Sequence, residues 1–302
     1  MKTKILLFIF SILAFSNVQS QCCTADAYAI AATIDDDSTP TLVSVDIVTG
    51  DFTPIAPLTP DPPGFDAGGE IIDCSYYFTD GSDIYEVDLT DGTTSLVIST
   101  SAQIAGTGTW TSLDVDPTTD ILYGSTASCG ASSSLYTIDL TAGTISLVGT
   151  TNAVTCAISV VIGPTGDAFY IDLVSDAIYP IDLSTGQPTG PGLPLGFDLN
   201  FGQDYSFDCP AGTGTVYGYA FNGGTFSMQY VEIDPTTGTT TLIQDFAPDG
   251  VDQIASFAFC VDNFVPPIPT MGEWGIISLS MLLMIFGLVA FRSRKSYHLL
   301  VK

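Results

Sequence analysis

The chain has 302 residues, with 33 acidic side chains against 6 basic ones and a formal net charge of −27. All Lys and Arg residues lie before residue 5 or after residue 291, so residues 21–273 contain no cation and no histidine. Phosphate recognition needs clustered cations and Ser-His-Asp or Cys-His catalysis needs a histidine base, so this composition excludes nucleic acid as a partner, both catalytic arrangements and a His-ligated metal centre.

Residues 1–20 are predicted to be a secretory signal peptide. Lys2 and Lys4 supply the positive start, residues 5–15 the apolar stretch, and residues 18–20 a cleavage site of the small-residue type. An uncleaved N-terminal anchor is the alternative, although the apolar stretch is short for a membrane span. The mature chain is therefore expected outside the cytoplasm.

One nine-residue pattern occurs five times along the middle of the chain. Each copy alternates apolar and polar residues up to an Asp and has a Gly four residues later. An Asp carboxylate accepts turn N–H groups and a Gly adopts positive φ, so each copy predicts a β-hairpin. The copies occupy residues 42–50, 84–92, 135–143, 178–186 and 230–238.

The spacing of these hairpins predicts the fold. Their Asp residues are 42, 51, 43 and 52 positions apart, and a second strand pair precedes most hairpins, as at 112–124, 158–170 and 205–217. Four strands per repeat of this length are typical of a β-propeller blade. We expect an all-β ectodomain, residues 21–262, with five blades, and with the strand at 254–262 completing the first blade. Six blades or an open sandwich are the alternatives, and the short stretch 68–78 leaves little room for two strands in the second blade.

The hairpin pattern resembles the LYxIDxxTGxxxxVG repeats of bacterial surface propellers of unknown function. The resemblance covers about residues 27–262 and implies the propeller architecture without an activity.

Seven cysteines follow the signal peptide, and export makes disulfides the expected state. From their places on the expected strands we favour Cys129–Cys156 and Cys209–Cys260, with Cys74 bonded to Cys22 or Cys23. The odd number leaves one thiol over. A soft-metal cluster is the alternative, but the chain has no C-x-x-C pair.

Paired carboxylates are the catalytic option that this composition leaves. A glycan hydrolase or lyase needs only two of them, and Glu70, with Asp66 and Asp73 close in sequence, is the candidate general acid. We nevertheless expect a non-catalytic role, because 29 Asp residues bring some carboxylates together without any function.

Calcium is the one cofactor that the sequence suggests. Hard oxygen ligands are grouped at Asp35–Asp37, at Asp114, Asp116 and Asp120, and at Asp204 and Asp208. The residues of the first two groups that we name as candidate ligands are Asp35, Asp36, Asp37, Asp114, Asp116 and Asp120. Solvated surface acids are the alternative at each group.

Four aromatic side chains are candidates for stacking on a sugar: Tyr76, Tyr77, Trp110 and Tyr219. Aromatic residues in strands also form cores, which is the alternative. The expected partner is an extracellular glycan or protein.

After Asp262 the composition changes to a proline-rich linker and motif, 263–274, an uncharged apolar stretch, 275–291, and a basic tail, 292–302. Seventeen residues of helix span about 25 Å, enough to cross a thin bilayer, and the flanking cations place the tail in the cytoplasm. The residues of the motif and of the basic stop are Ile268, Pro269, Thr270, Met271, Glu273, Trp274, Gly275, Arg292, Arg294 and Lys295.

This arrangement resembles the IPTL-type C-terminal sorting signal of Gram-negative bacteria, with Met271 in place of the usual Leu. The resemblance implies that the C-terminal helix first anchors the chain in the inner membrane. A sorting protease then cuts near the motif and passes the ectodomain to the cell envelope or outer surface. A permanent single-span anchor is the alternative.

Overall fold

A computed structural model of the chain describes residues 24–33, 39–72, 74–100, 103–104, 108–200, 204–208, 214–246 and 252–260. The chain divides into two units, Met1–Asp262 and Asn263–Lys302, and all the described residues belong to the first. The signal peptide, linker, apolar span and basic tail predicted from the sequence lie outside the described residues. Within the described ranges, no helix is long and apolar enough to cross a membrane.

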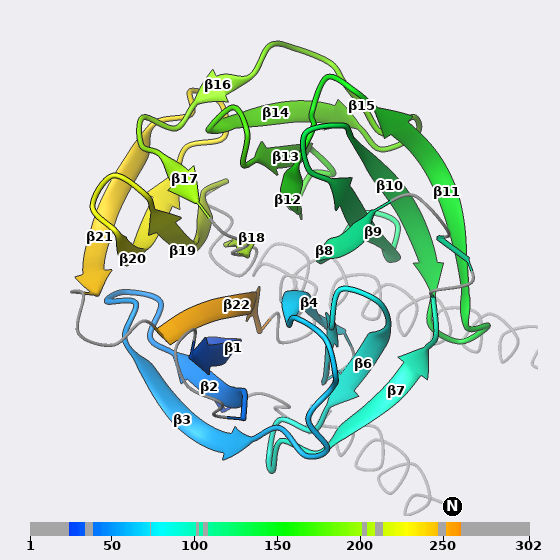
Figure 1. The fold of residues 1–302 in the computed structure, drawn as a ribbon, viewed down its shortest axis with the longest axis vertical. Helices are drawn as coiled ribbons and strands as arrows, with labels where there is room; N and C mark the ends of the chain where they lie inside the picture. The colour runs from blue at the N-terminus through cyan, green and yellow to red at the C-terminus, as the bar shows by residue number, and fades with distance from the viewer. Residues whose placement is uncertain are drawn as a thin grey trace, which may run out of the picture. The chain divides into compact units, whose positions relative to one another are not determined.

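The described residues form an all-β propeller with five four- or five-stranded sheets. The sheets surround a common centre, with β4, β8, β12, β18 and β22 innermost (Figure 1). Blade one contains β22 (Asp252–Phe259), β1 (Ala27–Thr33), β2 (Thr41–Val45) and β3 (Phe52–Pro57). Blade two contains β4 (Ala67–Ile72), β5 (Ser75–Thr79), β6 (Ile84–Val87) and β7 (Thr94–Ile98). Blade three contains β8 (Thr109–Asp116), β9 (Ile121–Ser128), β10 (Ser132–Asp139) and β11 (Thr144–Thr151).

The last two blades depart from this regular pattern. In blade four the outer strand is split in two, and in blade five the inner strand is split in two. Blade four contains β12 (Ala157–Ile162), β13 (Ala168–Asp172), β14 (Ala177–Asp182), β15 (Gln187–Pro188) and β16 (Leu193–Pro194). Blade five contains β17 (Leu199–Asn200), β18 (Tyr205–Phe207), β19 (Val216–Asn222), β20 (Ser227–Ile233) and β21 (Thr240–Phe246).

The ring closes by pairing its last strand with its first. β22 pairs antiparallel with β1 from Ala27↔Phe259 to Thr33↔Asp252, and the N–H of Cys260 donates to the carbonyl of Asp26 at 2.8 Å. This confirms the predicted closure and the five blades, because every predicted repeat hairpin belongs to one of the five sheets. The short stretch in blade two does hold two strands, since β4 and β5 are separated by only two residues.

The repeated Asp residues form turns, as their spacing predicts. Each carboxylate accepts a backbone N–H two or three residues further on, and each paired Gly has φ between 66° and 77°. In the last copy the N–H of Thr236 donates to Oδ1 of Asp234 at 2.8 Å, and the N–H of Gly238 donates to the Asp234 carbonyl at the same distance. These carboxylates therefore act locally.

Five buried clusters within the described residues hold the blades together, one for each pair of neighbouring blades. Blades one and two share Tyr28 and Tyr76, and blades two and three share Ile84 and Trp110. Because blades stack face to face, a strand inside a blade is covered on both sides, and all six residues of β12 are buried. Burying one large apolar side chain contributes about 1.5–3 kcal/mol.

A disulfide joins blade three to blade four. Cys129 follows β9 and Cys156 precedes β12, and the structure bonds them with Cα atoms 4.3 Å apart, as favoured from the sequence. Cys74 and Cys260 are also disulfide-bonded. Their expected partners, Cys22, Cys23 and Cys209, lie outside the described residues.

Candidate functional site

Four of the inner strands carry a β-bulge at the same place. Register shifts in β4, β8, β12 and β22 each leave one extra residue, and the residue after it is small: Gly69, Ser112, Ser159 or Ser256. A bulge re-aims the side chain that follows it. We call these four residues, together with Asp204, the axial ring.

Glycine is required where β4 closely approaches its neighbouring inner strands. Gly68, the bulge residue of β4, has φ +35°, and a Cβ there would overlap the backbone of Ser112 on β8. Gly69 has no room either, because a Cβ would meet the hydroxyls of Ser256 and Tyr76. The Gly-Gly pair therefore lets the backbone of β4 lie close to β8 and β22.

Asp204 connects blade five with the other four blades. It directly precedes β18 and its side chain is fully buried. Oδ2 accepts the N–H groups of Gly69 at 2.8 Å and Phe257 at 3.2 Å, and Oδ1 accepts the hydroxyls of Ser159 at 3.0 Å and Ser112 at 3.3 Å. Burial outweighs these hydrogen bonds and raises the pKa of Asp204 to about 7.

A pair of carboxyl groups links blade two to blade three. Glu70 on β4 and Asp114 on β8 are both buried and hydrogen-bonded to each other. Two carboxyl oxygens form such a bond only when one carries a proton. Burial raises the pKa of Glu70 to about 7, and burial together with the charge of Glu70 raises that of Asp114 well above its usual value.

Each carboxyl group of this pair also accepts a hydrogen bond from a backbone N–H group. The N–H of Ile71 donates to Oε1 of Glu70 at 2.8 Å, and the N–H of Ile162 on β12 donates to Oδ2 of Asp114 at 2.6 Å. The pair therefore joins three successive inner strands. Flanking carboxyls of glycosidases lie about 5–9.5 Å apart to accommodate the scissile bond or a water, whereas these two are in direct hydrogen-bond contact.

Asp66 is a separate buried carboxyl. It precedes β4, is 4% exposed, and its Oδ1 has no hydrogen-bond partner among the described residues. Burial and the nearby charges of Asp61 and Asp80 raise its pKa to about 7. It is not the hydrogen-bonding partner of Glu70, and Asp73, the other neighbour considered in the sequence, lies outside the described residues.

The three candidate calcium ligands of blade three have different surroundings. Asp114 belongs to the inner pair, and Asp116 accepts hydrogen bonds from Thr118 and Thr119 in its own turn. Asp120 is exposed with φ +57°. No three Asp, Glu, His or Cys residues in the described part of the chain are arranged to hold a metal ion. Asp35–Asp37 lie outside the described residues and stay a prediction.

Three of the four aromatic candidates for sugar stacking belong to the core. Tyr76, Trp110 and Tyr219 are at most 1% exposed. Tyr76 Oη is 2.6 Å from Oγ of Ser256, and Trp110 Nε1 donates to Oγ1 of Thr100 at 2.6 Å. Only Tyr77 is partly exposed.

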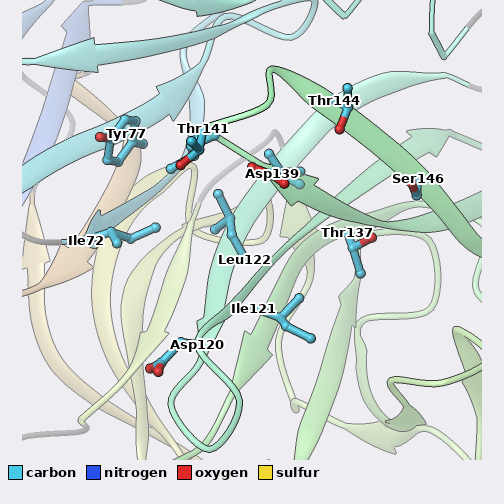
Figure 2. A pocket seen from close by; sticks show the side chains of 12 residues that line it. Ile72, Tyr77, Asp120, Ile121, Leu122, Thr137, Asp139, Thr141, Thr144 and Ser146 are labelled. Atoms are coloured by element: carbon cyan, nitrogen blue, oxygen red, sulfur yellow. The ribbon is translucent and has the colours of Figure 1, made fainter.

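Tyr77 lines an open cleft of about 640 Å³ between blades two and three. Figure 2 shows Tyr77 and Ile72 at the left, Leu122 and Asp139 in the middle, and Thr137, Thr144 and Ser146 at the right. The remaining lining residues come from blade three and are mainly polar: Asp120, Ile121, Thr137, Ile138, Leu140, Thr141, Thr144 and Ser146. A cleft of this size falls in the range of small-molecule sites.

Neither the serines of the axial ring nor the cleft was predicted from the sequence. A small residue stands at the same place in successive inner strands, at Gly69, Ser112, Ser159 and Ser256. Aligning the repeats on their inner strands exposes this signal. The lining of the cleft has no comparable local signal, because it comes from strands of two blades.

Residues 266–295 match the IPTL-CTERM motif. This motif is a C-terminal sorting signal of exported cell-surface proteins. The match confirms the sorting motif predicted from Ile268 to Lys295, and a location in the cell envelope is consistent with it.

No curated protein matches the chain in sequence. Among solved structures, it is similar to one in a nidogen/laminin complex, with 10% identity, a TM-score of 0.50 and coverage of 78% of this chain and 99% of that chain. It is also similar to TolB from Acinetobacter baumannii, with 16% identity, a TM-score of 0.46 and coverage of 74% and 54%. The calcium-binding protein regucalcin from Agrobacterium tumefaciens gives 15% identity, a TM-score of 0.41 and coverage of 68% and 65%. These similarities concern the fold alone.

Proposed function

We propose that this protein is a surface-sorted propeller that acts as a non-catalytic binding module on the envelope of a Gram-negative bacterium. The apolar stretch 275–291 first holds the chain in the inner membrane, and a sorting protease acts at the motif within 266–295. The five-bladed ring then presents its loops and clefts to an extracellular ligand.

The observation that supports the non-catalytic role is that the buried carboxyls of Glu70, Asp114 and Asp204 are all engaged in hydrogen bonds between blades. Glu70 and Asp114 are hydrogen-bonded to each other, and Asp204 accepts four hydrogen bonds from other blades. All three are at most 5% exposed. A general acid must reach its substrate within hydrogen-bond distance, and these groups contact other inner strands instead.

A carboxylate-dependent glycan hydrolase or lyase is the second candidate. One observation favours it: Asp66 combines a pKa of about 7 with an oxygen that has no partner among the described residues. Such a pKa suits a general acid at neutral pH.

The two candidates differ in product formation. The full-length protein in detergent micelles is incubated with uncharged and anionic polysaccharides, and both retention on the polymer and release of reducing ends or unsaturated sugars are measured. A binding module is retained without any release. Release that is abolished by Glu70→Gln or by Asp66→Asn, in a variant that stays folded, contradicts the non-catalytic role and identifies its acid.

A further inference from the structure

Two disulfide-bonded cysteines have surroundings that indicate their partners. Cys74 follows β4 and Cys260 follows β22, and both are disulfide-bonded. Within the described ranges, the only disulfide that joins two described cysteines is Cys129–Cys156. Cys74 and Cys260 are therefore bonded to two of the three remaining cysteines, which lie outside the described residues: Cys22, Cys23 and Cys209.

Cys260 lies on the face of blade one that is turned toward blade two. Along the end of β22, Phe257 and Phe259 pack into the cluster shared with blade five, whereas Ala258 and Cys260 pack into the cluster shared with blade two. This alternation is the period of two of a β-strand. Cys209 belongs to the sequence of blade five, and Figure 1 shows β22 between β18 of that blade and β4 of blade two. A bond to Cys209, favoured from the sequence, therefore needs the face that Cys260 does not use.

The start of the described chain reaches the same cluster as Cys260. The N–H of Thr24 donates to Oη of Tyr28 at 3.0 Å, and Ala25 packs against the cluster that contains Tyr28 and Cys260. The carbonyl of Asp26 accepts the N–H of Cys260 at 2.8 Å. Thr24 is therefore held beside the boundary between blades one and two.

The adjacent cysteines Cys22 and Cys23 directly precede Thr24. Consecutive Cα atoms are about 3.8 Å apart, and the Cα atoms of a disulfide are usually about 4.4–6.8 Å apart. A cysteine one or two residues before Thr24 is therefore within bonding reach of Cys260, on the face that Cys260 uses.

Cys74 lies at the same end of the ring as Cys260. The N–H groups of Gly69 on β4 and Phe257 on β22 both donate to Oδ2 of Asp204, so these two residues are level with each other. Blades are repeats around one axis, so β4 and β22 run in the same direction. Cys260 is three residues beyond Phe257 and Cys74 five residues beyond Gly69. Both cysteines therefore follow the ends of neighbouring inner strands.

We infer that the adjacent pair Cys22 and Cys23 bonds both Cys74 and Cys260, and that Cys209 is the cysteine left over. Cys74 belongs to blade two, and blade one lies between it and blade five, so the N-terminal pair is also the nearer source of its partner. This inference concerns the closure of the ring and is independent of the proposed function.

The two bonds make the closure of the ring sensitive to oxidation. Each bond forms from two thiols, which lose two protons and two electrons, and a disulfide oxidant outside the cytoplasm accepts the electrons and becomes a dithiol. Without these bonds, β22 and β1 close the ring by strand pairing. With them, the N-terminus, the last strand of the ring and blade two are joined covalently.

Peptide mapping of the full-length protein tests the pairing. The protein is purified from cell envelopes after free thiols have been blocked, and a protease that cuts before Asp is used, because the ectodomain contains no Lys or Arg for trypsin. The N-terminal peptide ending at Ala25 is expected to stay joined to peptides 73–79 and 252–261 until reduction. Peptide 208–233 is expected alone, with a blocked thiol at Cys209.

The disulfide between blades three and four is the internal control, since it joins peptides 120–138 and 139–166 in the same digest. A product in which peptide 208–233 is joined to any other peptide overturns the inference. A blocked thiol at Cys74 or Cys260 also overturns it.

Two matched variants test the effect on the ring. Cys209→Ser is expected to keep the three-peptide product and to change the midpoint of thermal unfolding by less than about 1 °C. Cys260→Ser is expected to expose one N-terminal thiol to the blocking reagent and to lower the midpoint by about 5 °C or more under non-reducing conditions. Loss of the three-peptide product in Cys209→Ser overturns the pairing. A midpoint of Cys260→Ser equal to that of the wild type overturns the covalent closure of the ring.

Discussion

The backbone N–H of Gly69 donates to Oδ2 of Asp204 at 2.8 Å, across 135 residues of sequence. The same carboxylate accepts from β8, β12 and β22, so one side chain of blade five contacts the inner strand of every other blade. Closing a ring of blades brings these distant segments together, and the buried donors need an acceptor there.

Asp204→Ala is expected to lower the free energy of unfolding by about 3 kcal/mol or more, because it leaves several buried donors without an acceptor. Asp204→Asn keeps one carbonyl oxygen and is expected to cost less. Urea denaturation measures both, with Asp120→Asn as the control, since Asp120 is exposed and Asn tolerates its positive φ. A loss for Asp204→Ala no larger than for the control contradicts the role of the axial ring.

The buried carboxyls predict that stability falls as the pH rises through neutrality. Asp66, Glu70 and Asp204 have pKa values raised to about 7, and the pKa of Asp114 is raised well above its usual value. In the unfolded chain these groups titrate near pH 4. Between about pH 4 and pH 7 the folded state therefore binds more protons, and the free energy of unfolding decreases with pH.

The turn carboxylates act in the opposite direction at lower pH. Hydroxyl groups of Thr or Ser in the same turn hold the pKa of Asp88, Asp182 and Asp234 below its usual value. Their contribution is lost as the pH falls below about 4. Denaturation at high salt, which screens the general repulsion, is expected to show maximal stability near pH 4, where the two effects meet. A maximum at pH 8 contradicts the buried-carboxyl account.

Two turn glycines provide a matched comparison. Gly50 and Gly143 have φ values of +77° and +66°. A Cβ at Gly50 would overlap the ring of Tyr230, whereas a Cβ at Gly143 would have no described atom within 4 Å. Gly143→Ala therefore costs only the backbone strain, about 1 kcal/mol. Gly50→Ala also displaces a buried tyrosine, and we expect at least twice that loss in thermal unfolding. Equal losses at the two positions would show that the close contact between Gly50 and Tyr230 of blade five contributes nothing to stability.

The disulfide between blades three and four is expected to stabilise the ring. Cys129 and Cys156 are 27 residues apart, and closing such a loop in the unfolded chain corresponds to about 3.5 kcal/mol. The double variant Cys129→Ser/Cys156→Ala, compared with wild type in denaturant under non-reducing conditions, measures this loss. A difference below about 1 kcal/mol is the contrary result.

The blades could be predicted from sequence patterns that extend over a few residues. The features that were not predicted depend on contacts between residues far apart in the sequence. The Asp and Gly of each hairpin satisfy one another within a few residues, so the turns and the blade count follow from spacing. Asp204 has partners 45 to 135 residues away, and spacing does not reveal them. Trp110 and Tyr219 were candidates for surface aromatics, but strands within stacked blades are covered on both faces. The alternation of polar and apolar residues therefore does not predict which side chains of these strands are exposed.

The central claim is that residues 266–295 sort this propeller to the cell surface. Surface labelling of intact cells, followed by intact mass of the labelled protein, tests it most directly. The account predicts labelled ectodomain whose C-terminus lies within 266–295, and no surface labelling when that segment is deleted. Equal surface labelling of the deleted and full-length chains contradicts the account.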